Sequence, residues 1–169
     1  IVASVEYRLA PEYRFPIAFE DCYAAAKALY TNRSLLKIHP DQITIMGDSA
    51  GGNLTAAVCL KARDTGDFMP KRQILIYPAL NNCYTDASPY PSVRENGTDY
   101  LLTSVKMEDY LKFYESCPKD RQNPYFAPLM AKEFTHLPRT LILTAEFDPL
   151  RDEGEDYAKK LQEAGNEVE

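Results

Sequence analysis

The pattern of apolar and polar positions predicts strands and helices that alternate along the chain. Short runs of apolar or β-branched residues predict strands at 1–7, 43–46, 73–77 and 140–145. Apolar residues at helical spacing predict helices over 16–30, 50–63, 104–114 and 150–164. Residues 166–169 look like the start of one more strand. This alternation favours an α/β fold with a mostly parallel sheet and helices on both faces.

Irregular stretches interrupt the alternation between residues 79 and 138. Residues 79–102 carry prolines, asparagines and tyrosines without a clear period, and long loops in compact domains usually have a function. Three tyrosines of this stretch offer apolar ring faces with a polar tip: Tyr84, Tyr90 and Tyr100. We therefore expect a single domain over 1–169, with an excursion at about 79–138 that forms a cap or walls a binding pocket.

Composition and charge narrow the class of protein. The chain has 169 residues, enough for one domain with a sizeable core. Its net charge of −6 and the lack of a basic run disfavour nucleic acid and anionic membranes as partners. No apolar run approaches the roughly 20 residues that a membrane-spanning helix needs. The four cysteines lack metal-binding or redox spacing, which disfavours a metal site and favours a reducing, cytoplasmic compartment.

A tight turn between a predicted strand and a predicted helix carries the main candidate chemistry. Its residues fit G-x-S-x-G, the nucleophile elbow, in which the serine oxygen is lifted clear of the sheet. The elbow comprises Gly47, Asp48, Ser49, Ala50, Gly51 and Gly52. Because such a turn crowds the backbone, we expect Gly47 and Gly51 to be needed for their lack of a Cβ. The N–H of Ala50, at the start of the helix, would donate to a developing oxyanion.

Asp148 is the candidate for the acid partner of Ser49. A serine nucleophile needs a base, and the base needs an orienting carboxylate. Asp148 follows a strand that comes after the elbow, which agrees with the chain order Ser–Asp–His of α/β-hydrolases. The two histidines, His39 and His136, both precede a predicted strand, at the end opposite to Ser49. We therefore expect neither to be the base.

The serine turn also fits two readings that involve no elbow. The G-x-S-x-G pattern arises by chance in turns of small residues, and Asp-Ser-Ala-Gly-Gly resembles the serine turn of chymotrypsin-like proteases. In those proteases the fold is all-β, and the histidine and aspartate precede the serine. The predicted helix directly after Ser49 argues against the protease.

Three motifs resemble the hormone-sensitive-lipase-like branch of α/β-hydrolases, which includes bacterial esterases and arylacetamide-deacetylase-like enzymes. They are Tyr-Arg-Leu-Ala-Pro-Glu at 7–12, Gly-Asp-Ser-Ala-Gly-Gly-Asn at 47–53 and Asp-Pro-Leu-Arg-Asp-Glu-Gly at 148–154. The resemblance implies the α/β-hydrolase fold and hydrolysis of carboxylic esters, usually with short acyl chains, without a cofactor. It also implies Ser49 as nucleophile and Asp148 as triad acid. In these motifs, Arg8, Glu12 and Asp152 are interpreted as structural, through ion pairs that brace loops.

The chain departs from the family's pattern at both ends. The family's His-Gly-Gly motif, which supplies further oxyanion donors, would precede Ile1, and its catalytic histidine would follow Glu169. We therefore expect the middle part of a serine carboxylesterase or lipase-like hydrolase, inactive alone. In this fold a further strand separates those at 1–7 and 43–46, so we expect a gap or a non-native pairing, and self-association through exposed strand edges. The alternatives are a non-catalytic ligand-binding member of the family and an inactive fragment.

Overall fold

The computed structural model describes residues 1–32, 34 and 37–169. Its named strands form one parallel sheet in the order β1-β2-β3. They are β1 (Thr44–Asp48), β2 (Arg72–Ile76) and β3 (Arg139–Leu143). Asp48 lies opposite Ile76, which lies opposite Leu143, so the strands end at one edge of the sheet. Val168 adds a single parallel bridge to Thr140 beside β3, where the start of another strand was predicted.

In the described part, five α-helices accompany the sheet. They are α1 (Ile17–Thr31), α2 (Ala50–Thr65), α3 (Pro91–Glu95), α4 (Ser104–Tyr114) and α5 (Arg151–Glu163). Three short 3-10 turns complete the chain: η1 (Pro40–Gln42), η2 (Pro118–Gln122) and η3 (Pro128–Met130). The four predicted helices and three of the predicted strands are confirmed, each with ends shifted by two residues or fewer. The helix α3 was not predicted, because five residues are too few to show a period.

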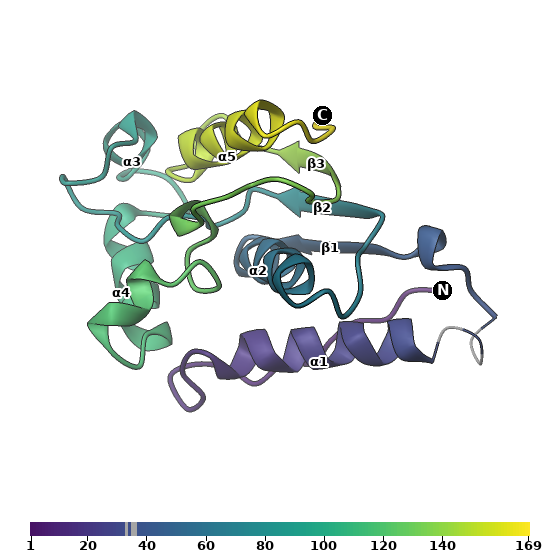
Figure 1. Ribbon diagram of the computed structural model, residues 1–169. Helices are drawn as coiled ribbons and strands as arrows, with labels where there is room; N and C mark the ends of the chain where they lie inside the picture. The colour runs from purple at the N-terminus through teal and green to yellow at the C-terminus, as the bar shows by residue number, and fades with distance from the viewer. Residues whose placement is uncertain (33, 35–36) are drawn as a thin grey trace.

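The helix α2 lies at the centre of the fold because small side chains let it approach the sheet closely. Ala56, Ala57, Cys59 and Ala62 have no exposed surface. On one side α2 contacts β1 and β2, and on the other it contacts α1. Figure 1 shows α3 and α4 beyond the arrowheads of the strands. The excursion between β2 and β3 therefore lies at the end of the sheet where the candidate site residues follow their strands.

The predicted parallel sheet with packed helices is confirmed, and the helices of the described part cover one face of this sheet. Tyr157 and Leu161 of α5 share a buried cluster with residues of α2, with Leu75 and with the partly buried Ile142. Met46, on the other face, is 59% exposed. The continuous apolar runs of β2 and β3 are typical of strands covered on both faces.

The predicted strand at residues 1–7 is absent. A strand needs a neighbour for its backbone N–H and C=O groups, and β1 pairs with β2 alone in the described sheet. Residues 1–6 are exposed and run beside α1, where a shallow groove separates Ala3–Glu6 from Ala25, Ala28 and Leu29. Of the two outcomes expected for this edge, the structure therefore has the gap and not the non-native pairing.

Candidate functional site

Ser49 occupies a strained turn between β1 and α2, as the elbow pattern predicts. Its backbone has φ +51° and ψ −114°, a conformation that residues other than glycine rarely adopt. The turn is held by its backbone: the N–H of Ser49 donates to the Ile76 carbonyl at 2.8 Å, and its carbonyl accepts from Asn53 at 3.1 Å and Ala79 at 3.3 Å. The Ser49 side chain does not cap α2, which leaves its hydroxyl available for another role.

Close packing explains two glycines of the elbow, but not both of those predicted. A Cβ on Gly47 would lie 2.3 Å from the backbone of Gly51, and a Cβ on Gly52 would lie 2.8 Å from the Pro78 side chain. A Cβ on Gly51 would meet no atom within 4 Å. Crowding therefore requires Gly47 and Gly52, and the crowding argument for Gly51 is wrong.

The N-terminus of α2 presents free backbone donors beside Ser49. The first N–H that bonds back to Ser49 is that of Asn53, so the N–H groups of Ala50, Gly51 and Gly52 precede the intrahelical ladder. The first turn carries no acidic side chain that would offset the positive end of the helix dipole. The exposed Asp48 precedes Ser49 at the end of β1. This end of α2 is suited to stabilising negative charge that develops next to Ser49.

Asp148 lies in the loop between β3 and α5, at the same edge of the sheet as Ser49. Its carboxylate Oδ1 accepts from the N–H of Leu150 at 2.9 Å, and its carbonyl accepts from the N–H of Arg151 at 3.1 Å. The side chain is half-buried, and this burial raises its pKa, with the Leu150 N–H opposing the shift. A half-buried carboxylate at this edge has the setting that a triad acid needs.

The motif aspartate Asp152 is engaged in structural contacts instead. Its Oδ2 accepts from the N–H of Ser92 at 2.7 Å, and its Oδ1 pairs with Arg151 at 2.8 Å. Burial opposes the ionised form, but these partners hold the pKa of Asp152 below its usual value. The motif arginine Arg8 pairs with Asp21 at 2.6 Å and not with Glu12. The loop-bracing role predicted for Arg8 and Asp152 agrees with these contacts.

Both histidines lie at the amino-terminal edge of the sheet. His39 caps η1 before β1, with its Nδ1 accepting from the Asp41 N–H at 3.3 Å. His136 lies three residues before β3. Strands of five residues are about 16 Å long, which separates this edge from Ser49 by far more than a hydrogen bond. Neither histidine is brought to Ser49.

Glu153 is a buried carboxyl near Asp148 that was not predicted from the sequence. It has no exposed surface, and its Oε1 accepts from the Leu80 N–H at 2.6 Å, the Tyr84 hydroxyl at 2.8 Å and the Asn81 N–H at 3.3 Å. Its Oε2 is buried without a partner in the described part. Burial raises the pKa of Glu153 to about 8, although these donors lower it. The carboxyl ties α5 to the segment that follows β2.

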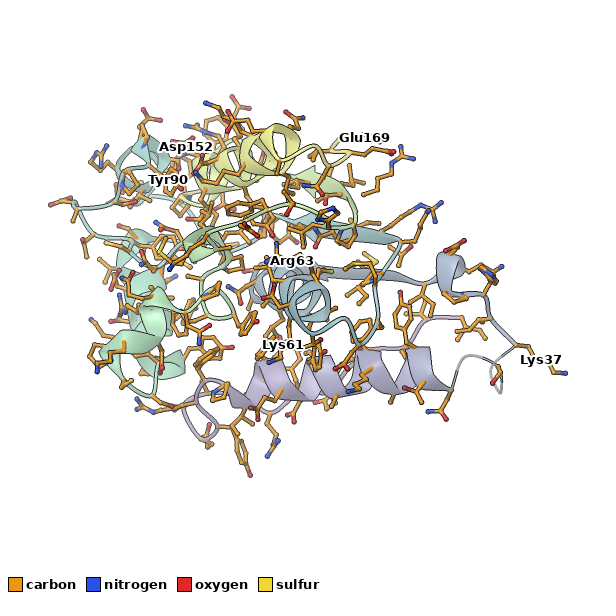
Figure 2. The ribbon with its side chains drawn as sticks, viewed as in Figure 1. Lys37, Lys61, Arg63, Tyr90, Asp152 and Glu169 are labelled. Atoms are coloured by element: carbon orange, nitrogen blue, oxygen red, sulfur yellow. The ribbon has the colours of Figure 1, made fainter. Side chains whose placement is uncertain are left out.

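The three tyrosines of the excursion have different surroundings. Tyr84 is 1% exposed and donates to Glu153, so the prediction that it walls a pocket is wrong. Tyr90 is half-buried and donates to Asp156 of α5 at 2.7 Å; Figure 2 shows Tyr90 at the end of the molecule that also holds Asp152. Tyr100 is 44% exposed and stacks on Phe147, with ring centroids 5.5 Å apart. Of the three, Tyr100 is the most exposed.

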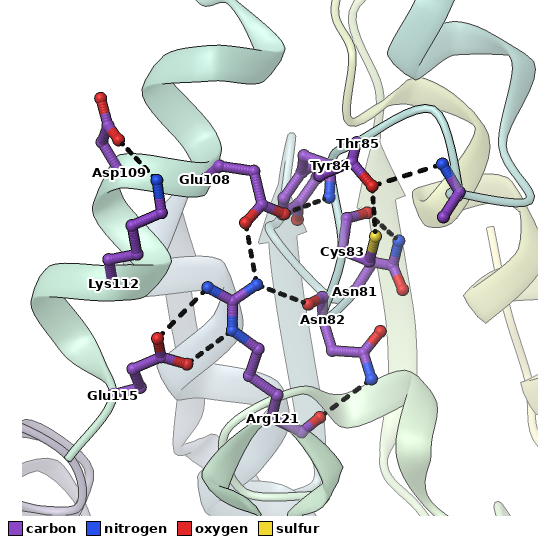
Figure 3. Close-up of polar contacts among 11 residues, drawn as sticks. Asn81, Asn82, Cys83, Tyr84, Thr85, Glu108, Asp109, Lys112, Glu115 and Arg121 are labelled. Atoms are coloured by element: carbon purple, nitrogen blue, oxygen red, sulfur yellow. Dashed lines mark hydrogen bonds and ion pairs between the residues drawn. The ribbon is translucent and has the colours of Figure 1, made fainter. Parts of the chain in front are cut away.

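Within the excursion, Arg121 joins α4 and the residue that follows it to the segment that follows β2 (Figure 3). The Arg121 guanidinium pairs with Glu115 at 2.6 Å and with Glu108 at 2.9 Å. Glu108 also accepts from the N–H of Tyr84 at 2.7 Å, and Arg121 donates to the Asn82 carbonyl at 3.3 Å. The excursion is therefore an ordered layer rather than a loose loop.

The described residues form neither a metal cluster nor a membrane span. Among them, no group of three or more His, Cys, Asp or Glu side chains is arranged to hold a metal ion. No helix of the same part is long and apolar enough to cross a membrane. The cysteines carry free thiols: Cys22, Cys59, Cys83 and Cys117.

Comparison with known proteins gives one consistent result. The sequence profile of a family described as alpha/beta hydrolase fold matches residues 1–169. An arylesterase of Saccharolobus solfataricus is 41% identical over 164 residues, which cover 97% of this chain and 52% of the relative. Arylacetamide deacetylase of Bos taurus is 30% identical, over 99% of this chain and 56% of the relative.

Solved structures match the chain at a similar identity and over a similar share of each chain. EstE1, a thermophilic carboxylesterase cloned from a metagenomic library, superposes with a TM-score of 0.89 at 41% identity. The match covers 96% of this chain and 55% of EstE1. The chain therefore spans about half the length of the relatives it matches.

Proposed function

The chain belongs to the hormone-sensitive-lipase-like branch of the alpha/beta hydrolase fold family, and from this we propose that the protein is a carboxylic ester hydrolase that acts through a Ser-His-Asp triad. Ser49 is the nucleophile and Asp148 the acid. The observation that carries this proposal is the elbow: Ser49 has a strained backbone at a strand end, directly before the N-terminus of α2. Esterase relatives over almost the whole chain support the reaction class.

The mechanism assigns each group a step. The Ser49 oxygen attacks the ester carbonyl while a histidine outside residues 1–169 takes its proton. The N–H of Ala50 donates to the oxyanion of the tetrahedral intermediate, helped by the dipole of α2. Asp148 orients the histidine and stabilises its charged form. The histidine then protonates the leaving alcohol, and water releases the acyl group by the same steps.

Small esters with short acyl chains are the proposed substrates, and the excursion at about 79–138 forms part of the pocket wall. The stack of Tyr100 on Phe147 supports the role in the pocket wall. It places exposed aromatic surface of the excursion against the loop that holds Asp148. The free thiols support the proposed cytoplasmic location, since disulfides are rare there.

Residues 1–169 alone are proposed to be inactive and to self-associate. Both histidines of the chain lie at the wrong edge of the sheet, so Ser49 lacks a base within this chain. The edge of β1 that faces away from β2 and the exposed Met46 offer unpaired backbone and apolar surface to a second copy. The alternative function, ligand binding without turnover, is equally compatible with this placement of the histidines.

Hydrolysis of p-nitrophenyl acetate and butyrate by the full-length protein tests the proposal. Ser49→Ala is expected to lower kcat by several powers of ten, while the control Ser4→Ala, an exposed serine outside the site, keeps wild-type turnover. Turnover of Ser49→Ala within tenfold of wild type would contradict the assignment. A wild-type protein that binds esters without hydrolysing them would favour the binding function.

A further inference from the structure

We propose that Asn96 positions the loop that carries Asp148, and that it therefore sets the turnover of the proposed ester hydrolysis without touching substrate. The inference rests on the proposed function. It assigns a task to a side chain that belongs to none of the three family motifs and that lies 52 residues before Asp148 in the chain.

One side-chain amide holds two carbonyls of this loop. The Nδ2 of Asn96 donates to the carbonyl of Glu146 and to the carbonyl of Asp148, both at 3.3 Å. Both partners are acceptors, so the NH2 group and not the amide oxygen must face them. Asn96 is 5% exposed, and water is therefore a poor substitute for its two bonds. The amide therefore fixes the peptide unit between Glu146 and Phe147 and the peptide unit between Asp148 and Pro149, so it holds the backbone before and after the residue that carries the carboxylate.

The short helix α3 holds Asn96 in place against the loop. The N–H of Asn96 donates to the Ser92 carbonyl at 2.9 Å at the end of α3. Ser92, which has no exposed surface, donates its hydroxyl to the Pro149 carbonyl at 2.8 Å. At the outer side, Glu95 pairs with Arg151 at 3.0 Å. The short helix α3 and its C-cap residue Asn96 thus hold the loop both before and after Asp148.

The orientation of the Asp148 carboxylate depends on these contacts of α3 and Asn96 with the loop. Its Oδ1 accepts from Leu150, a backbone group of the same loop, so a shift of the loop moves the carboxylate with it. A misplacement of about 1 Å in a catalytic group costs about 100-fold in rate. Because the buried Asn96 amide does not face a ligand, we expect its loss to lower kcat and to leave KM nearly unchanged.

The test compares Asn96→Ala with Asn166→Ala in the full-length protein. Asn166 is a matched control because its half-buried Nδ2 also donates to two carbonyls, those of Phe134 at 2.7 Å and Leu161 at 2.9 Å, and its Oδ1 accepts from Leu137 just before β3, at the edge of the sheet opposite to the loop that carries Asp148 (the acid loop). Asn96→Ala is expected to lower kcat for p-nitrophenyl butyrate about 10- to 100-fold. The acidic limb of its pH–rate profile should move to lower pH, because the base loses part of the stabilisation of its charged form. Asn166→Ala should keep the wild-type kcat and acidic limb, whatever its effect on thermal stability.

The result that overturns the inference is an Asn96→Ala protein with lowered thermal stability but wild-type kcat and an unmoved acidic limb. If Asn96→Ala does not fold, Asn96→Ser replaces it, since a hydroxyl can donate to one of the two carbonyls. That variant is expected to have an intermediate kcat, and a wild-type kcat and limb would again refute the inference. Ser49→Ala separates the two proposals: if it retains activity, the proposed function itself is wrong.

Discussion

Glu153→Gln changes a carboxyl that the structure buries completely. Glutamine keeps the oxygen that accepts from Leu80, Asn81 and Tyr84, and it replaces the carboxyl O–H with an amide that cannot ionise. In the folded protein burial raises the pKa of Glu153 to about 8, well above the usual value near 4.5. We therefore expect the two proteins to differ in how their stability depends on pH.

The sign follows from proton binding. Between these two pKa values the folded state keeps a proton that the unfolded state has released, so the free energy of unfolding falls as pH rises. The stabilisation from the bound proton is complete below the unfolded pKa and is lost as pH rises through the folded pKa. The limiting slope is about 1.4 kcal/mol per pH unit, which gives about 2–3 kcal/mol between about pH 5.5 and pH 7.5.

Urea denaturation of the wild type and the variant at these two pH values measures the effect. The free energy of unfolding of the wild type should fall by about 2–3 kcal/mol relative to Glu153→Gln over this interval. Glu163→Gln, an exposed position at the end of α5, serves as control and should leave the pH dependence of the wild type unchanged. Parallel pH dependences for wild type and Glu153→Gln would refute the reasoning and mean that Glu153 is ionised in the folded protein.

Further changes test the elbow, the acid and the isolated chain. Gly47→Ala should destabilise the protein by about 3 kcal/mol or prevent folding, because its Cβ meets backbone, whereas Gly51→Ala should stay within about 1 kcal/mol of wild type in urea denaturation. Asp148→Asn should lower kcat by about 10⁴, while Asp152→Asn should act mainly on thermal stability; a reversed order would mean that the wrong acid was chosen. Residues 1–169 expressed alone should not turn over esters and should exceed the mass of a monomer in light scattering, and a monodisperse, active monomer would contradict both expectations.

Local pattern was sufficient for most of the fold and for the elbow. The strand before Ser49 and the helix after it follow from residues that are neighbours in the chain, so periodicity and the glycine spacing were enough to predict both. Residues 1–7 failed because a strand also requires a partner, and an apolar sequence does not report whether one is present. Which face of the sheet the helices cover also depends on packing between elements that are far apart in the chain.

The groups around Asp148 show the other limit of sequence reasoning. Glu153 had a signal that was overlooked, because it lies four and eight residues before the buried Tyr157 and Leu161, on the buried stripe of α5. Asn96 had none, since its contacts with the acid loop join residues about fifty positions apart. Tyr84 was misread because an amphipathic ring suits a pocket wall and a core hydrogen bond equally well.

Covalent labelling of the full-length protein with a fluorophosphonate tests the role of Ser49 most directly. Such a reagent phosphonylates a serine only where a base and an oxyanion site activate it. Mass spectrometry of the digested protein should place one adduct on the peptide that contains Ser49, with loss of esterase activity in step with labelling. An adduct on another serine, or ester hydrolysis that persists after Ser49 is fully labelled, would contradict the account.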